Sequence, residues 1–367
     1  MGLETGDVVE LELGGRKVEA PVWVLPGQAQ GSVAVTLGYG RTRGGKIGVG
    51  VGFDAYRLRT STAFWHAGGL KVTKTAKHRP FAVTQGHNRM EGRDLLRTQR
   101  YGDKAHEHEG PPHLSLYPPI EYPKHAWAMA IDLATCIGCN ACVVACHAEN
   151  NVPVVGREQV LAGREMQWLR VDAYLEGPDD NPQTSFQPVP CQQCENAPCE
   201  TVCPVTATVH SDEGLNDMVY NRCVGTKYCS NNCPYKVRRY NFFGYSVDDV
   251  FGLDMKAASV RLMHNPDVTV RSYGVMEKCT YCVQRINYGR LQAKKEDRRV
   301  RDGEVQTACQ TACPTRAITF GDKNDARSEV SARRGEPRNY ALLAELNTNP
   351  RTTYLASLRN PNPEIAG

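Results

Sequence analysis

The stretch that decides the fold is CIGCNACVVAC, residues 136–146. Its cysteines follow the spacing Cys-x2-Cys-x2-Cys-x3-Cys, and three thiolates this close in sequence can each bind one iron of a single iron–sulfide cubane. The fourth cysteine of such a run points away and binds a different cluster. The spacing therefore predicts iron–sulfur clusters that come in pairs.

Three further cysteine groups follow along the chain. They are Cys191-x2-Cys194-x4-Cys199-x3-Cys203-Pro204, Cys223-x5-Cys229-x3-Cys233-Pro234, and a split group made of Cys279-x2-Cys282 and, after a gap of 26 residues, Cys309-x3-Cys313-Pro314. The proline that ends each of these groups turns the chain away from the site. Together with the first group they imply two pairs of clusters.

The third group lacks one thiolate. When it is aligned on the first group, Thr226 occupies its second ligand position. A threonine hydroxyl is a poor iron ligand because it stays protonated where a thiol ionises. The corner iron would have no thiolate, so we predict a [3Fe–4S] cluster here. Losing one thiolate and one iron changes the net charge, which is one determinant of cluster potential.

The cysteine count agrees with this assignment. Three [4Fe–4S] clusters need twelve cysteines and one [3Fe–4S] cluster needs three, which uses all fifteen in the chain. An odd, tightly clustered set in a chain of this length argues against a disulfide framework. Zinc knuckles also use Cys-x2-Cys pairs, but the first run is too crowded for one tetrahedral site. Spacing leaves the pairing of the groups open: sequential, or nested with first to fourth and second to third.

Composition and patterning limit the other function classes. The 367 residues carry a net charge of +4, which is too weak to imply binding of nucleic acid. No apolar run reaches the roughly 18 residues that span a bilayer. The N-terminus lacks the features of a signal peptide, so we expect either a cytoplasmic protein or export beside a subunit that carries the signal. The basic run from Arg285 to Arg301 is typical of a solvated helix face, with partner docking as the second interpretation.

The chain divides into four parts, and an α+β fold is expected. Residues 1–112 are predicted to form a β-barrel. Strands are expected over 7–13, 16–25 and 32–36, with glycine-rich turns between and after them. Residues 113–125 are predicted to be a linker. Residues 126–321 form the cysteine-rich domain, with a strand over 167–175 and a charged helix over 284–300. Residues 322–367 show no regular period and are expected to form an extended tail.

The four cysteine groups resemble those of the four-cluster ferredoxin subunits of the molybdopterin oxidoreductase family, such as the polysulfide, dimethyl sulfoxide and nitrate reductases. The resemblance implies a double ferredoxin-like domain with nested pairing. Its implied ligand sets are Cys136, Cys139, Cys142 and Cys313 for one [4Fe–4S] cluster, Cys279, Cys282, Cys309 and Cys146 for the second, Cys191, Cys194, Cys199 and Cys233 for the third, and Cys203, Cys223 and Cys229 for the [3Fe–4S] cluster, with Thr226 at its vacant corner.

A narrower resemblance comes from both ends of the chain. The stretches that carry it are VWVLPGQA (22–29), TLGYGR (36–41), GVGFDAY (50–56), NYALLAELN (339–347) and PRTTYL (350–355). They resemble the later portion of the iron–sulfur B subunit of alternative complex III. The first three are similar to its double-psi barrel, a domain like those that bind molybdopterin dinucleotide. Since this part has no cysteine, we expect no molybdopterin, and a split-gene partner would supply the molybdopterin-enzyme-like portion that lacks the cofactor.

That resemblance implies a non-catalytic electron-transfer subunit of a membrane quinol:acceptor oxidoreductase. The implied partners are a polytopic quinol-binding membrane subunit, with the three-iron cluster nearest the membrane, and c-type cytochrome subunits. The protein would lie peripherally on the cytoplasmic membrane, on its periplasmic face, with no spanning segment of its own. Two alternatives stay open: the iron–sulfur subunit of a molybdopterin-dependent respiratory reductase of the polysulfide or dimethyl sulfoxide type, and a structural scaffold with redox-silent clusters.

Overall fold

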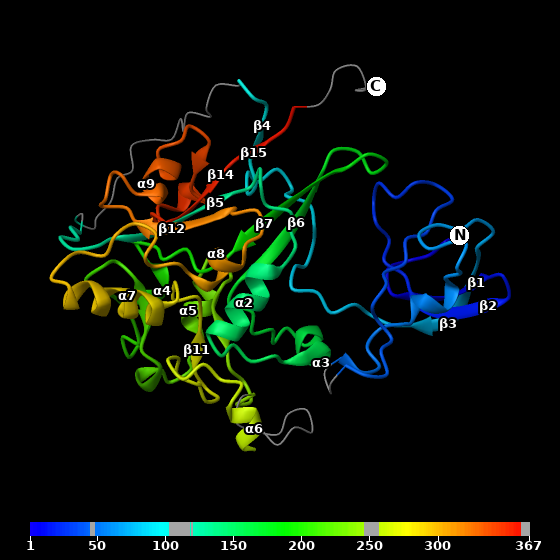
Figure 1. The fold of residues 1–367 in the computed structure, drawn as a ribbon, viewed down its shortest axis with the longest axis horizontal. Coiled ribbons are helices and arrows are strands. Elements are labelled where there is room, and N and C mark those ends of the chain that lie inside the picture. The colour runs from blue at the N-terminus through cyan, green and yellow to red at the C-terminus, as the bar shows by residue number, and fades with distance from the viewer. Residues whose placement is uncertain (45–47, 103–117, 119, 246–256, 361–367) are drawn as a thin grey trace. The chain divides into compact units, whose positions relative to one another are not determined.

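The computed structural model describes residues 1–44, 48–102, 118, 120–245 and 257–360 (Figure 1). They form two compact units. The first unit consists of residues 1–83, 156–162 and 176–183, and the second contains the remainder of the chain, including every cysteine group. Part of the predicted linker over 113–125 lies outside the described residues.

A three-stranded antiparallel sheet organises the first unit. Strands β1 (Asp7–Leu13) and β2 (Arg16–Pro21) form a hairpin around Gly14 and Gly15, whose positive φ angles suit glycine. Strand β3 (Lys71–His78) pairs with the other side of β1. Alternating residues of β1, Val9 and Leu11, pack with residues of β2 to make the core. The predicted first strand and its glycine turn are confirmed.

The predicted barrel is not confirmed, because the described residues of this unit form no closed sheet. The expected strand over 32–36 is wrong: these residues are all exposed and lie in a loop, and the expected strand over 16–25 ends at Pro21. A strand needs a partner to satisfy its backbone groups. Here the third strand is β3, and the glycine-rich stretch stays in irregular loops.

A four-stranded sheet of order β12-β5-β14-β13 forms the centre of the second unit (Figure 1). Its strands are β5 (Trp127–Asp132), β12 (Ile318–Asp322), β13 (Asn339–Tyr340) and β14 (Thr352–Leu355). Strand β14 pairs in parallel with β5, and Val330 of helix α9 (Glu329–Arg334) packs on Ala128 and Ala130. The extended tail expected over 322–367 is wrong for its described part: residues 322–360 contribute two strands of the sheet and helix α9, because they pair and pack through tertiary contacts that leave no regular period in the sequence.

The elements that border the cysteine groups are short. The helices are α2 (Ala141–Glu149), α4 (Pro198–Thr201), α5 (Tyr228–Asn231), α7 (Val283–Lys295) and α8 (Ala308–Ala312), and the small strand pairs are β8 (Thr208–His210) with β9 (Asn216–Met218) and β10 (Arg239–Tyr240) with β11 (Met276–Glu277). The helix expected over 284–300 is confirmed as α7, although it ends at Lys295.

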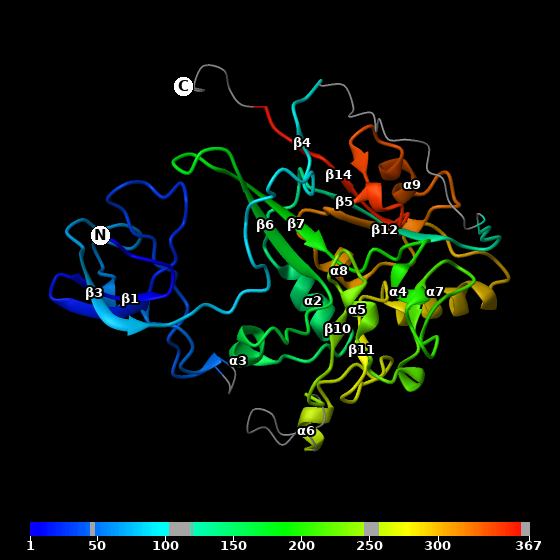
Figure 2. The ribbon, with the colours of Figure 1, turned by 180° about the vertical axis from the view of Figure 1, so that it is seen from behind.

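A long ribbon of two strands, β6 (Arg170–Glu176) and β7 (Gln183–Val189), is seen clearly from behind in Figure 2 and confirms the strand expected over 167–175. The other elements are β4 (Thr98–Gln99) paired with β15 (Ser357–Leu358), α3 (Gly156–Leu161), α6 (Ala258–Arg261), and the 3-10 helices η1 (Ala55–Leu58), η2 (Tyr220–Arg222) and η3 (Ala344–Leu346). No helix among the described residues is long and apolar enough to cross a bilayer.

Replacement of Ile131 by alanine tests the importance of the central strand. The Ile131 side chain is fully buried in β5, so I131A leaves a cavity and should lower stability by about 2–5 kcal/mol. Thermal unfolding of the iron-loaded protein, followed by circular dichroism, measures the change. The matched variant I120A removes the same atoms from a side chain that is 57% exposed, and it should unfold within about 0.5 kcal/mol of the parent protein. Equal losses in the two variants would contradict the prediction.

Candidate iron–sulfur sites

Antiparallel pairing of two strands brings the first cysteine group to the fourth. Strand β5 ends just before Cys136, β12 begins just after Cys313, and Ile131 lies opposite Ile318 in their register. The helices that adjoin these groups, α2 and α8, pack against each other. Both groups therefore lie at the same end of the β5–β12 pair.

A small hairpin brings the second group to the third. Strand β8 begins after Cys203, β9 ends before Cys223, and Thr208 lies opposite Met218. Helices α4 and α5 belong to these two groups and also pack against each other. Sequence spacing left the pairing open, whereas these contacts join the outer two groups to each other and the inner two to each other.

The thiols affect one another electrostatically in four sets. In each set the pKa of at least one thiol is raised, first by burial and then by the charges of its neighbours. These thiols and neighbours are Cys142 with Cys136, Cys313 and Cys139, Cys146 with Cys279, Cys282 and Cys309, Cys194 with Cys191, Cys199 and Cys233, and Cys229 with Cys223 and Cys203. Each thiolate makes ionisation of a nearby thiol less favourable, so these mutual effects indicate that the thiols of each set lie close together.

Successive sets also adjoin one another. The charge of Cys142 in the first set affects Cys309 in the second, and Cys191 in the third set affects Cys279 in the second. Arg238 influences thiols of both the third and fourth sets, Cys199 and Cys229. The four sets therefore follow one another in a row through the second unit.

Two cavities open between the thiols of the third and fourth sets. One has an empty volume of about 310 Å³ and is lined by four cysteines, Cys191, Cys194, Cys199 and Cys233. The other has an empty volume of about 280 Å³ and is lined by three cysteines, Cys203, Cys223 and Cys229, and by two threonines, Thr208 and Thr226. The donor set of the second cavity is one thiol short.

The backbone repeats itself around Thr226. Asn140 and Lys227 both adopt left-handed conformations, with φ angles of 61° and 60°, and each caps the start of a short helix whose second residue is a cysteine. The residue just before the cap is Cys139 in the first case and Thr226 in the second. Thr226 therefore occupies the position equivalent to Cys139, as the sequence alignment of the two groups predicts.

Backbone N–H groups point at the sulfur atoms. The N–H of Ala207 donates to Cys203 Sγ at 3.1 Å and that of Ala317 donates to Cys313 Sγ at 3.2 Å. Cys282 Sγ accepts from the N–H of Ala308 at 3.4 Å. Such donors favour the thiolate, which is the form that binds iron. The converging thiols with their N–H donors suit iron–sulfur clusters.

Two thiols have lowered pKa values although burial opposes their ionisation. Burial acts most strongly on Cys203, but hydrogen bonds from the N–H groups of Val205, Ala207 and Thr208 together leave its pKa lowered. The pKa of Cys313 is lowered in the same way, through the Thr315 hydroxyl and several N–H groups. Each cysteine precedes a proline, and the turn that follows supplies these donors.

Two polar side chains at the thiol sets were missed from the sequence. Asn150, which is almost fully buried, donates from Nδ2 to Cys146 Sγ at 3.6 Å and to Cys282 Sγ at 3.8 Å. Arg238 lines the four-cysteine cavity. Neither position is marked by spacing, and the basic pair Arg238-Arg239 in particular looks like an ordinary surface patch in sequence.

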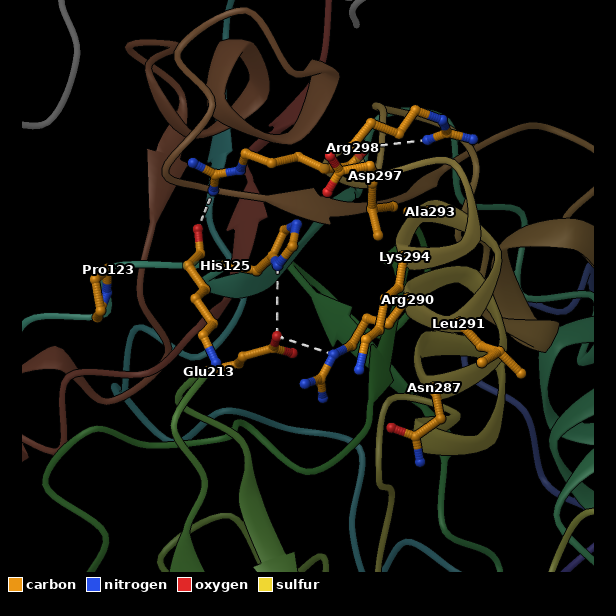
Figure 3. A pocket seen from close by; sticks show the side chains of 13 residues that line it. Pro123, His125, Glu213, Asn287, Arg290, Leu291, Ala293, Lys294, Asp297 and Arg298 are labelled. Carbon is orange, nitrogen blue, oxygen red and sulfur yellow. Dashed lines mark hydrogen bonds and ion pairs between the residues drawn. The ribbon is translucent and has the colours of Figure 1, made fainter.

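The basic run over 285–301 lines an open groove of about 1470 Å³ between α7 and the residues around His125. Figure 3 shows Glu213 between His125 and Arg290, with its Oε1 at 3.4 Å from His125 Nδ1 and 3.3 Å from Arg290 Nε. Arg298 pairs with Glu296 and Glu304. Because carboxylates offset these charges, the groove agrees with the interpretation of the run as a solvated helix face.

Comparison with known protein families agrees with this geometry. Two family models match the sequence, and both describe a 4Fe-4S dicluster domain. The first covers residues 135–207 and the second covers residues 182–247. Together they include the first three cysteine groups.

Curated relatives match more than half of the chain. The iron–sulfur cluster-binding subunit of menaquinone reductase from Nitratidesulfovibrio vulgaris is 38% identical over 64% of this chain and 89% of its own length. Iron–sulfur subunit 1 of the Hdr-like menaquinol oxidoreductase from Archaeoglobus fulgidus is 34% identical over 63% of this chain and 83% of its own. The B subunit of polysulfide reductase from Wolinella succinogenes is 34% identical over 56% and 81%. This protein therefore belongs to the family of iron–sulfur subunits of molybdopterin-type oxidoreductases.

Proposed function

We propose that this electron-transfer subunit holds three [4Fe–4S] clusters and one [3Fe–4S] cluster and carries electrons from a quinol-oxidising partner towards an acceptor. The observation that carries the proposal is the contrast between the two neighbouring cavities: one is lined by four thiols, and the other by three thiols and the Thr226 hydroxyl. A four-iron cluster needs four thiolate ligands, and a site with three suits a three-iron cluster.

The ligand sets in this proposal are the four sets of converging thiols. The first is Cys136, Cys139, Cys142 and Cys313, the second Cys146, Cys279, Cys282 and Cys309, the third Cys191, Cys194, Cys199 and Cys233, and the fourth Cys203, Cys223 and Cys229. The strand and helix contacts that join the groups support this nested arrangement over a sequential one.

Burial of the cysteines supports a path rather than four independent sites. All cysteines of the second and third sets are buried. The first and fourth sets, at the two ends of the row, contain the exposed Cys139 and the half-buried Cys136, Cys203, Cys223 and Cys313. Electrons would enter and leave at ends near the surface and pass through an interior that excludes water.

The clusters supply the redox chemistry, and the protein supplies binding, orientation and electrostatics. The thiolates fix each centre in place. Backbone N–H groups and the amide of Asn150 donate to the sulfurs and stabilise their negative charge. No side chain at these sites is assigned an acid–base or nucleophilic role.

For the assembly, we propose alternative complex III. The stretches over 22–29, 36–41, 50–56, 339–347 and 350–355 support this choice. The partners would be a polytopic quinol-binding subunit, c-type cytochromes and a molybdopterin-enzyme-like subunit without cofactor. The complex would lie on the periplasmic face of the membrane. The first unit would be a barrel domain like those that bind molybdopterin dinucleotide.

The second candidate assembly is a reductase of the polysulfide or dimethyl sulfoxide type, which the relatives favour. Mass spectrometry of the complex purified through this subunit separates them: multihaem cytochrome c indicates the former and a molybdenum-loaded subunit the latter.

Thr226→Cys tests the three-iron site. The new thiol should provide the fourth ligand, so iron should rise from fifteen to sixteen atoms per chain, and the [3Fe–4S] resonance of the oxidised protein should be lost. The potential of that centre should fall, because a four-iron cluster would replace the three-iron one and cluster type is one determinant of potential. Iron and sulfide analysis with electron paramagnetic resonance measures both. Thr226→Ser keeps a hydroxyl at the same place and should leave the signal intact. An unchanged spectrum in T226C would mean that the three-iron site lies elsewhere.

Cys146→Ser tests the nested arrangement. The variant should damage the centre held by Cys279, Cys282 and Cys309 and spare the one held by Cys191, Cys194 and Cys199. Cys233→Ser is the matched variant, and it should do the opposite. Mössbauer and electron paramagnetic resonance spectra of the two reduced proteins should therefore lose different four-iron components. If C146S removes the component that C233S removes, the nested arrangement is wrong.

A redox titration of the unmodified protein distinguishes an electron-transfer role from a purely structural one. Each centre should be reduced and reoxidised reversibly when followed by electron paramagnetic resonance, since neighbouring sets of thiols adjoin one another. Centres that do not respond to the applied potential would leave only the structural role.

A further inference from the structure

Arg238 is an arginine buried between two of the thiol sets. Its exposed fraction is 3%, and it follows Cys233 by a short turn that leads into β10. Its Nη2 donates to Thr208 Oγ1 at 2.7 Å and lies 3.2 Å from Met218 Sδ, and its Nη1 donates to Asn216 Oδ1 at 3.3 Å. These contacts fix the guanidinium group in one position.

Arg238 lines one of the two cavities, and its hydrogen-bond partners line the other. Arg238 and Asn216 line the cavity of the third set, and Asn216 Oδ1 lies 3.8 Å from Cys199 Sγ. Thr208 and Met218 line the cavity of the fourth set, which contains Cys203, Cys223 and Cys229. The side chain of Arg238 therefore lines the cavity of the third set and is hydrogen-bonded to Thr208 in the wall of the fourth.

The charge of Arg238 has no carboxylate partner. Among the residues that the structure describes, no Asp or Glu oxygen lies within 4.0 Å of its guanidinium, and its Nε atom has no hydrogen-bond partner. An unpaired buried cation costs several kcal/mol, because its hydration is lost without compensation. Arg239 provides the contrast, since its Nη1 pairs with Glu165 Oε1 at 2.5 Å. Arg238 therefore needs an anion from another source.

We propose that the two adjacent clusters are the anions that balance the charge of Arg238, and that this charge raises the reduction potentials of both clusters. The inference rests on the proposed function, since it requires clusters at the third and fourth sets. A thiolate-bound cluster carries net negative charge, and each added electron increases it. In a water-poor interior a fixed positive charge stabilises that electron more strongly than at the surface. Arg238 is a positioning residue in this sense: it holds charge beside the centres and ligates no iron.

The direction of the effect follows from the sign of the charge. Removal of the cation should make both centres harder to reduce and lower their midpoint potentials. The first set and the second set lie on the far side of the third, so their potentials should change less. The thiol electrostatics agree with this geometry: burial raises the pKa of Cys199 and Cys233 in one set and of Cys229 in the other, and the charge of Arg238 opposes that rise in all three.

Arg238→Met, made in the full-length protein loaded with iron and sulfide, is the principal test. Redox titration by electron paramagnetic resonance should show lower potentials for the [3Fe–4S] centre and for one [4Fe–4S] centre. The expected shift is at least tenfold in the one-electron equilibrium constant, about 59 mV. Arg239→Met is the matched control: it removes the same atoms from the neighbouring residue, whose charge is already paired, and should shift neither potential by that amount.

Arg238→Lys separates charge from shape. Lysine keeps the positive charge but not the planar guanidinium, so potentials should stay nearer to the parent values than in R238M. If R238M loses a cluster, retention of all clusters with near-native potentials in R238K supports the inference, whereas loss in both variants overturns it.

The failures of the two proposals are distinguishable. A full complement of iron and sulfide in R238M with both potentials unchanged overturns the role of Arg238 and leaves the cluster assignment standing. A parent protein that takes up no iron and sulfide under the same loading overturns the cluster assignment itself.

Discussion

The structure depends on keeping thiolates charged in places where burial opposes charge. Ten of the fifteen cysteines are buried, and burial is the largest cause of the raised pKa values of Cys146, Cys194 and Cys309. A thiol must ionise to bind iron, so each buried site needs compensation. It comes from backbone N–H groups in the tight turns, from the Asn150 amide, and from the charge of Arg238. The metal ions would supply the rest.

Strand pairs hold the cysteine-bearing turns in place relative to one another. The β5–β12 pair fixes the distance between the first and fourth groups, and the β8–β9 hairpin does the same for the second and third. Strand β14 then buries the other side of β5, and the Arg351 side chain ties it to the carbonyl oxygens of Trp127 and Glu213. A loop that carries cluster ligands buries few apolar side chains itself. The neighbouring strand pairs therefore determine its position.

The sequence predicts some of these features far better than others. The cluster sites and the equivalence of Thr226 with Cys139 could be predicted, because the ligands of one cluster lie at fixed, short spacings along the chain. Strand β14 could not, since four residues, Thr352–Leu355, carry no usable period and pair through tertiary contacts. Arg238 was missed because adjacent arginines look alike in sequence, although Arg239 pairs with a carboxylate and Arg238 faces the thiols. The expected strand over 32–36 followed a β-like composition in a segment without a strand partner.

The fourth set differs from the others in two features. Thr226 stands where the first group has a thiol, and Arg238 adds a buried positive charge nearby. A fixed positive charge in a water-poor interior favours the reduced state of a neighbouring centre. The third set has four thiols but shares the same cation, and the first set has four thiols and the exposed Cys139. The electrostatic environment of the thiols therefore differs along the row, because the charge of Arg238 acts on thiols of the third and fourth sets. Cys203 and Cys223 of the fourth set are only half-buried, so this end of the row is also open to the approach of a partner.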